Sequence, residues 1–221
     1  MNITTRFNDP IAEYKLVDAY FRWALMALVE VLGENGLDLL LRSVGMERYS
    51  QVYASDKLEV VSNLEYHDFS KVIMAAMEVF GQSSRNNLYY SGRVSARHAM
   101  RKNGEMFHPP ENLRSRRSQL EQQVRDSLET LIEGYSNIAR RAGQGYKAWI
   151  EETDKHYYYH LESCAICAGV SANEPVCMFF SGSLMESLRW FTGKQFEVVE
   201  VACRANGDLA CVWQISKYPK D

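Results

Sequence analysis

The chain has 221 residues, 46% of them hydrophobic, and 25 basic and 28 acidic residues leave a net charge of −3. These values argue against a disordered chain, and the charge balance gives no general attraction to nucleic acid or to an anionic membrane. The first ten residues lack the apolar run of a signal peptide, and the most apolar stretch, 23–32, is too short to span a bilayer. We therefore expect a cytoplasmic protein.

The first two-thirds of the sequence predicts helices. Apolar residues spaced by threes and fours predict a helix from Ile11 to about Leu32, which ends at Gly33. Further helices are expected over 37–44, from Asp68 or Ser70 to Phe80, over 86–97, and from Arg114 to about Ala142. The proline-containing segment 104–112 interrupts this series.

The last third of the sequence predicts an antiparallel sheet with a helix packed on it. Strands are expected over 146–151, 156–161, 175–180, 195–203 and 210–215, with a capped helix over 183–191. Asn206, Gly207 and Asp208 are typical of a hairpin turn. The predicted fold class is α+β, with an N-terminal helical region (1–112) packed on a C-terminal region (113–221) that contains the sheet.

All five cysteines lie in this last third, at positions 164, 167, 177, 203 and 211. In a cytoplasmic protein we expect reduced thiols, which are buried core residues, metal ligands or redox groups. A three-residue hairpin loop over 206–208 places Cys203 opposite Cys211, close enough for two sulfurs to share one metal ion. Glu200 reaches the same ion only if its strand twists or bulges, so spacing alone does not favour Glu200 over Cys164 or Cys167.

The C-terminal sequence resembles the 4-vinyl-reductase domain family, which includes the sensor domains of phenol-responsive transcription activators. The resemblance rests on the run from Pro175 to Leu188 and on Glu200-x-x-Cys203 followed by Gly207-Asp208-x-x-Cys211. It implies a zinc site formed by Cys177, Glu200, Cys203 and Cys211. Four protein ligands leave no open position, so this zinc is expected to be structural.

The Cys164-Ala-Ile-Cys167 pair is interpreted separately. It lacks the strand-to-helix setting of a thioredoxin motif, because Gly169 and a loop follow it. Buried thiols are the favoured interpretation, and alternative metal ligands or a reactive pair remain open.

Aromatic residues crowd the C-terminal region. Most are expected to pack the sheet against helices, but together with polar tips they also fit an apolar ligand pocket. The resemblance, to a family often described as hydrocarbon-binding, supports the pocket. The residues expected to bind the ligand are Trp149, Tyr157, Tyr159, His160 and Trp190.

These features together favour a sensor or carrier of a small hydrophobic or aromatic ligand. The alternative is a role in bacteriochlorophyll biosynthesis, as a tetrapyrrole reductase or carrier, which the family's name suggests. The sequence has no nucleotide-binding loop and no convincing catalytic triad, so we predict no catalytic residues and do not expect nucleic-acid binding. The family's fold implies a homodimer through the N-terminal helices, in which a second subunit would cover apolar residues such as Phe21, Trp23 and Leu25. Any signal would pass to a partner protein.

Overall fold

A computed structural model describes residues 3–6, 8–50, 63–103, 107, 109, 111, 113 and 119–220. Its helices are α1 (Asp18–Ser43), α2 (Tyr66–Phe80), α3 (Ser84–Asn103), α5 (Leu120–Arg141) and α6 (Met178–Thr192). Its strands are β1 (Ile3–Thr5), β2 (Ala148–Glu152), β3 (His156–Leu161), β4 (Val170–Ala172), β5 (Phe196–Ala202) and β6 (Cys211–Pro219). Four short 3-10 turns complete this part of the chain: η1 (Glu47–Tyr49), η3 (Gly81–Ser83), η5 (Ala165–Cys167) and η6 (Arg204–Asn206).

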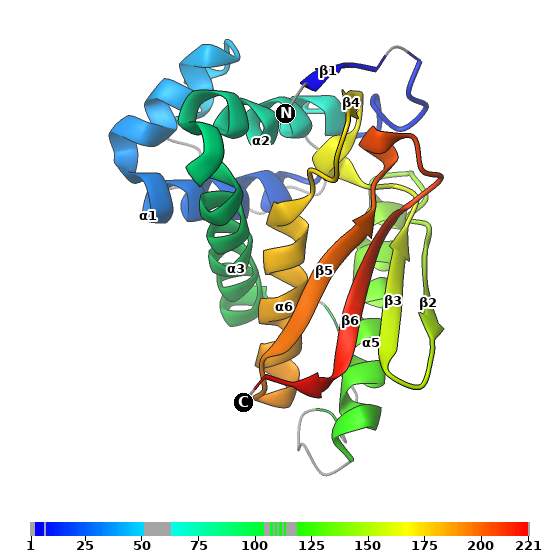
Figure 1. The fold of residues 1–221 in the computed structure, drawn as a ribbon. Helices are drawn as coiled ribbons and strands as arrows, with labels where there is room; N and C mark the ends of the chain where they lie inside the picture. Colours follow the sequence, from blue (N-terminus) through cyan, green and yellow to red (C-terminus); the bar gives the residue numbers. More distant parts are fainter. Residues whose placement is uncertain are drawn as a thin grey trace.

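The main sheet is antiparallel and has the strand order β2-β3-β6-β5. Side chains alternate across β3 and β6, so that Tyr157, Tyr159, Trp213 and Ile215 are buried on one face. Helices α5 and α6 cover this face, and α1, α2 and α3 form a further layer beyond α6 (Figure 1). The chain therefore has the predicted α+β class, with a helical layer on an antiparallel sheet.

Helices α3 and α6 cross at very close range because a glycine lies at the crossing on each helix. A Cβ atom added to Gly182 would lie 1.9 Å from the Tyr89 carbonyl oxygen, and one added to Gly92 would lie 1.8 Å from that of Phe179. No other residue type fits at either position without moving a helix. This contact fixes α6, which carries part of the candidate site, against the N-terminal layer.

The predicted N-terminal helices are present with shifted ends. Helix α1 begins at Asp18 rather than Ile11, and it bends at Gly33, where φ is +75°, before continuing to Ser43. Helix α2 begins at Tyr66 behind a capping box that Glu65 and Asp68 form. Helix α3 is longer than predicted, and α5 is described from Leu120. Residues 114–118 and most of the predicted break at 104–112 lie outside the described residues.

The predicted strand over 175–180 is wrong, because α6 already begins at Met178. The short apolar run there fits either structure by periodicity alone. In the helix, Phe179 packs against Phe69 of α2 while Phe180 packs against Trp213 of the sheet. The same residues therefore bury their rings on both sides of α6.

The main hydrophobic core extends from Ile11 to Ile215 and joins the helical layer to the sheet. Phe21, Trp23, Leu25 and Leu28 are buried within this single chain. Their burial removes the argument that they need a second subunit to cover them. None of the described helices is both long and apolar enough to cross a membrane.

Candidate functional site: a cysteine cluster beside an apolar cavity

The β5–β6 hairpin places Cys203 and Cys211 face to face. Ala202, the last residue of β5, pairs with Val212, which brings Cys203 next to Cys211, the first residue of β6. The turn η6 ends at Gly207, whose φ of +96° favours glycine, and the Cys203 N–H donates to Asp208 Oδ2 at 2.8 Å. The predicted closeness of Cys203 and Cys211 is confirmed, since their sulfurs lie 4.0 Å apart. The predicted three-residue loop over 206–208 is wrong, because the paired strands end at Ala202 and Cys211 and the η6 turn lies between them.

A bulge in β5 brings Glu200 into the same site. Glu200 pairs with Trp213 whereas Ala202 pairs with Val212, so the strand holds one extra residue between them. Such a bulge is the condition under which Glu200 and Cys203 share a side. Glu200 Oε2 accepts a hydrogen bond of 2.7 Å from the Cys177 N–H, which orients the carboxyl group toward the cysteines.

All five cysteine sulfurs meet in one buried cluster. Cys177 Sγ lies 3.7 Å from that of Cys164, 3.8 Å from Cys203 and 3.9 Å from Cys211, and Cys167 lies 3.4 Å from Cys211. These separations far exceed the ~2.05 Å of a disulfide, and all five thiols are free. Cys164 and Cys167 are buried, as favoured from the sequence, but they belong to the same cluster as the other three.

The donors of the cluster fit a metal ion. There are two sets of four donor atoms, and within each set all four atoms lie within 4.8 Å of one another. The first set comes from Cys164, Cys167, Cys177 and Cys211, and the second from Cys177, Glu200, Cys203 and Cys211. Two sulfurs bound to a tetrahedral zinc at ~2.3 Å lie roughly 3.8 Å apart, and the measured sulfur separations are close to this value. The cluster can therefore hold zinc without large movements.

Glu200 gives a second reason to expect a cation. Its Oε1 atom is buried and has no hydrogen-bond partner among the described residues. Burial, and then the neighbouring Cys203, raise the pKa of Glu200 to about 10. A buried carboxyl group in this setting is costly unless a cation or a donor reaches it, and a metal ion at the cysteines would do so.

A buried ion pair between Asp9 and Arg204 joins the N-terminal segment to the hairpin. Arg204, next to Cys203, donates to Asp9 at 2.7 and 3.3 Å, and Asp9 also accepts the Gly169 N–H at 2.9 Å. The Arg204 N–H points at Cys211 Sγ, 3.4 Å away. The ion pair is buried, so residues nearly 200 positions apart in sequence hold the cysteine loops together.

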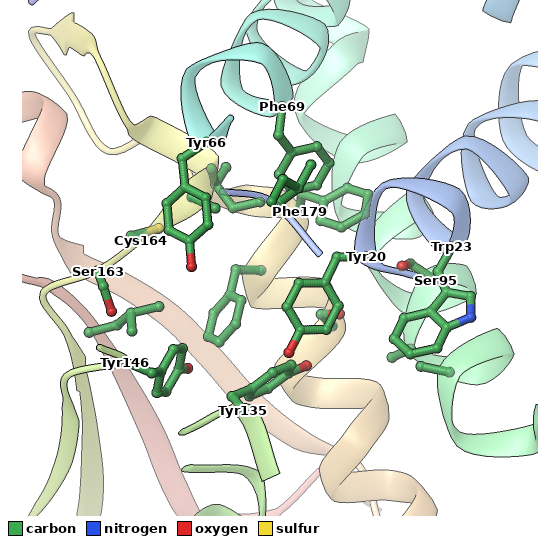
Figure 2. Close-up of a pocket in the computed structure, with 18 of the residues that line it drawn as sticks. Tyr20, Trp23, Tyr66, Phe69, Ser95, Tyr135, Tyr146, Ser163, Cys164 and Phe179 are labelled. Atoms are coloured by element: carbon green, nitrogen blue, oxygen red, sulfur yellow. The ribbon is translucent and has the colours of Figure 1, made fainter. Parts of the chain in front are cut away.

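An apolar cavity of about 90 Å³ lies beside the cluster, between the helical layer and the sheet. Its walls come from α1, α2, α3, α5, α6 and the loop before η5, and the rings of Tyr20, Tyr66, Tyr135 and Tyr146 surround it (Figure 2). Cys164 belongs both to this lining and to the cysteine cluster. The cavity and the candidate metal centre therefore share a wall.

The tyrosine hydroxyls around the cavity differ in their partners. Tyr146 and Tyr159 hydrogen-bond to each other at 2.8 Å. The Tyr20 hydroxyl is buried and has no hydrogen-bond partner among the described residues. Burial raises the pKa of Tyr135 to about 12 and that of Tyr20 well above its ordinary value. Tyr20 is thus a neutral donor and acceptor beside the cavity.

Comparison with known proteins places the C-terminal sheet in a family. Residues 158–217 match the model of the 4-vinyl-reductase domain. The chain contains a 4-vinyl-reductase domain. Over 55 residues the chain is also 33% identical to the uncharacterized protein MJ0745 of Methanocaldococcus jannaschii, a match that covers 25% of this chain and 30% of that protein.

The 4-vinyl-reductase domain and the helical layer together resemble H-NOX structures. The chain aligns with an oxygen-binding H-NOX domain related to soluble guanylate cyclases, in its oxygen complex, with a TM-score of 0.57 and 13% identity, covering 92% of this chain and 96% of that one. A structure from work on heme distortion in the H-NOX family gives a TM-score of 0.59 at 13% identity, with 93% and 97% covered. A mutant H-NOX of T. Tengcongensis gives 0.56 at 13%, with 91% and 97% covered. At this identity the likeness is one of fold.

All four metal ligands predicted from the sequence lie within the cluster, on the hairpin of the 4-vinyl-reductase domain or just before its helix α6. The five predicted ligand-binding residues lie outside the cavity lining. Trp149 is 37% exposed and stacks on His160 at 4.7 Å, on the outer face of the sheet, and Trp190 is 42% exposed. The Tyr157 hydroxyl donates to the Glu121 carbonyl, and the Tyr159 hydroxyl hydrogen-bonds to that of Tyr146, which does line the cavity.

The sequence reasoning missed the cavity residues of the helical layer. Tyr20, Tyr66 and Tyr135 are far apart in sequence, and each belongs to a helical stripe that predicts ordinary core packing. The one available signal is the tyrosine itself, since a fully apolar stripe needs no hydroxyl group.

Proposed function

We propose that the chain binds a small, mostly apolar molecule with one polar group in this cavity, as a sensor or carrier, and that the cysteine cluster is a structural zinc centre. The observation that carries the proposal is the Tyr20 hydroxyl, which is buried beside an apolar cavity without a partner among the described residues. A buried hydroxyl without a partner costs about 1–3 kcal/mol. A ligand with a hydroxyl or carbonyl group would recover this cost.

The size of the cavity limits the ligand class. An apolar cavity of ~150 Å³ is known to accept benzene, and this cavity measures about 90 Å³. A single ring therefore fits once the walls move slightly, and the flexible Met100 side chain lies in the lining. A tetrapyrrole is several times larger, so the size of this cavity favours a small ligand over the bacteriochlorophyll alternative and over heme.

The shared wall suggests how metal and ligand cooperate. Four protein ligands would leave the zinc closed to substrates, so its contribution is structural. Cys177 belongs to both sets of candidate ligands and its sulfur lies 3.7 Å from that of Cys164, so a zinc ion at the cluster would hold the packing surface of the loop that carries Cys164. With that wall fixed, a ligand that enlarges the cavity displaces the helices of the N-terminal layer instead. Ligand binding then shifts the population of the helical layer, which a partner protein could detect.

Further features remain part of the proposal. From the family resemblance, and no longer from exposed apolar residues, we infer a homodimer through the N-terminal helices. We also infer that the protein is cytoplasmic, that it has no catalytic residues, and that 1–112 and 113–221 act as one unit. Trp149, Tyr157, Tyr159 and His160 would contribute to binding only as part of the sheet beneath the cavity, and Trp190 only as part of α6. Light scattering that gives the mass of one chain, 25.4 kDa, at micromolar concentration would contradict the dimer.

Ligand binding can be tested by calorimetric titration with phenol and with benzene, which have the same ring but differ in the hydroxyl group. We expect phenol to bind more tightly than benzene. Tyr20→Phe should lower phenol affinity by roughly 3–10-fold, the value of one neutral hydrogen bond, and leave benzene affinity unchanged. Tyr90→Phe is the matched control, because Tyr90 is exposed and outside the lining.

A cavity-filling variant completes the test. Ala96→Leu adds side-chain volume from α3 into the lining and should abolish binding of both compounds while the zinc content stays unchanged. The proposed cavity would be refuted if neither compound binds the wild-type protein, or if Ala96→Leu binds both as well as the wild type.

A further inference from the structure

The two sets of candidate metal ligands overlap in a specific way. Cys177 and Cys211 belong to both sets. Cys164 and Cys167, from the loop at η5, complete only the first, and Glu200 and Cys203, from the hairpin, complete only the second. Six donors thus form two four-donor groups that share one edge.

Each group has the spacing of a tetrahedral site. Around the second, the sulfurs of Cys177, Cys203 and Cys211 form a triangle with sides of 3.8, 3.9 and 4.0 Å, and the unpaired Oε1 of Glu200 supplies a fourth donor. Around the first, Cys164 lies 3.7 Å from Cys177, and Cys167 lies 3.4 Å from Cys211. Both groups are close to the roughly 3.8 Å expected for sulfurs on one tetrahedral zinc.

We propose that the cluster binds two zinc ions, with the thiolates of Cys177 and Cys211 bridging them. One ion is completed by Cys164 and Cys167, and the other by Glu200 and Cys203. The proposal rests on the proposed zinc centre and deepens it, because a structural site of the family's pattern needs only the second group.

A single ion leaves part of the cluster unexplained. An ion in the first group leaves Glu200 and Cys203 buried without a cation, and an ion in the second leaves Cys164 and Cys167 against sulfurs that already bind metal. Two divalent ions with five thiolates and one carboxylate carry the same formal charge, −2, as one divalent ion with four thiolates. The second ion therefore brings every donor into use without adding net charge to the interior.

The arrangement also matches the position of the cluster in the fold. The loop with Cys164 lines the cavity, and the hairpin with Cys203 is clamped by Asp9 and Arg204. Two ions would link these loops through the start of α6, at Cys177, and of β6, at Cys211. We expect the bridging sulfurs to move closer than 3.9 Å, because two ions across a shared edge repel each other.

Native mass spectrometry of the full chain, titrated with zinc under reducing conditions, tests the stoichiometry. We expect two zinc ions per wild-type chain. The double variant Cys164→Ser/Cys167→Ser should retain one, and so should Glu200→Gln/Cys203→Ser. One zinc in the wild type that survives Cys164→Ser/Cys167→Ser would overturn the two-ion proposal and leave the structural zinc centre standing. No zinc in the wild type would overturn both.

Cadmium NMR of the wild-type chain tests the bridging and does not depend on any variant folding. With cadmium in place of zinc, we expect two metal signals, each correlated with four ligands or fewer. Both should show coupling to the β-protons of the same two cysteines, Cys177 and Cys211. A single cadmium signal, or two signals that share no cysteine, would overturn the proposal.

Discussion

Replacing Asp9 with asparagine tests whether the N-terminal segment holds the cysteine loops in place. The Asp9 side chain is fully buried, and Arg204, its partner, is only 8% exposed. Both carboxylate oxygens are used, since Arg204 donates to each of them and the Gly169 N–H donates to Oδ2. In Asp9→Asn one oxygen becomes an NH2 group, so a donor faces a donor and the guanidinium loses its buried counter-charge.

Loss of one partner from a buried ion pair costs about 3–5 kcal/mol, and we expect about 3 because asparagine keeps the volume and one acceptor. Urea unfolding at pH 7 measures this loss. Glu197→Gln is the control: its pair with Lys220 is exposed on both sides, so its loss should cost at most ~1 kcal/mol. A decrease below ~0.5 kcal/mol for Asp9→Asn, within the range of ordinary surface substitutions, would refute the clamp.

The difference in free energy of unfolding between the wild type and Asp9→Asn depends on pH, because Asp9 is a titratable group. Burial raises the pKa of Asp9, but the hydrogen bonds from Arg204 and Gly169 outweigh burial and lower it below its ordinary value of 3.8. The folded protein therefore holds the ionised form more strongly than the unfolded chain does. The stabilisation is complete above pH 3.8 and is lost as the pH falls through the lowered pKa, so the gap between wild type and Asp9→Asn should narrow only in strong acid.

Three other predictions follow from local contacts. Gly182→Ala should lower the free energy of unfolding in urea by at least ~1–3 kcal/mol, because the added Cβ would lie 1.9 Å from the Tyr89 carbonyl oxygen. Gly145→Ala is the control and should not lower it, because no atom lies within 4 Å of its added Cβ. A chelator should lower the thermal midpoint of the zinc-loaded protein, and an unchanged midpoint with complete zinc removal would show that the centre does not support folding. Tyr146→Phe should cost about 1 kcal/mol by removing the 2.8 Å hydrogen bond to Tyr159, and equal stability in thermal melts would argue that water replaces it.

The hairpin and its cysteines are the part of the site that the sequence predicts best. The turn residues around Gly207 between two strand patterns predict a hairpin, so the closeness of Cys203 and Cys211 follows from a few neighbouring residues even though the loop is longer than predicted. The bulge in β5 that includes Val201 cannot be predicted from neighbouring residues in the same way. It depends on how the whole strand twists against β6, and only the family resemblance selected Glu200.

The remaining site features depend on contacts between distant parts of the chain. Cys164 and Cys167 reach the cluster through the loop between β3 and β4, whose path spacing alone does not specify. The cavity forms where α1, α2, α3 and α5 meet α6, so its residues carry the signature of core packing in every local window. The sequence wrongly predicts a strand at the start of α6 for the same reason, because tertiary packing of Phe179 and Phe180 selects the helix there.

An anomalous difference map at the zinc edge, from crystals grown without chelator, tests the metal centre most directly. The account predicts two peaks, one on each side of the line joining Cys177 and Cys211, with Cys164 and Cys167 at one peak and Glu200 and Cys203 at the other. One peak at Glu200 and Cys203 would support a single structural zinc and contradict the bridged pair. A map with no peak at the cysteine cluster, from protein that binds phenol normally, would contradict the metal centre altogether.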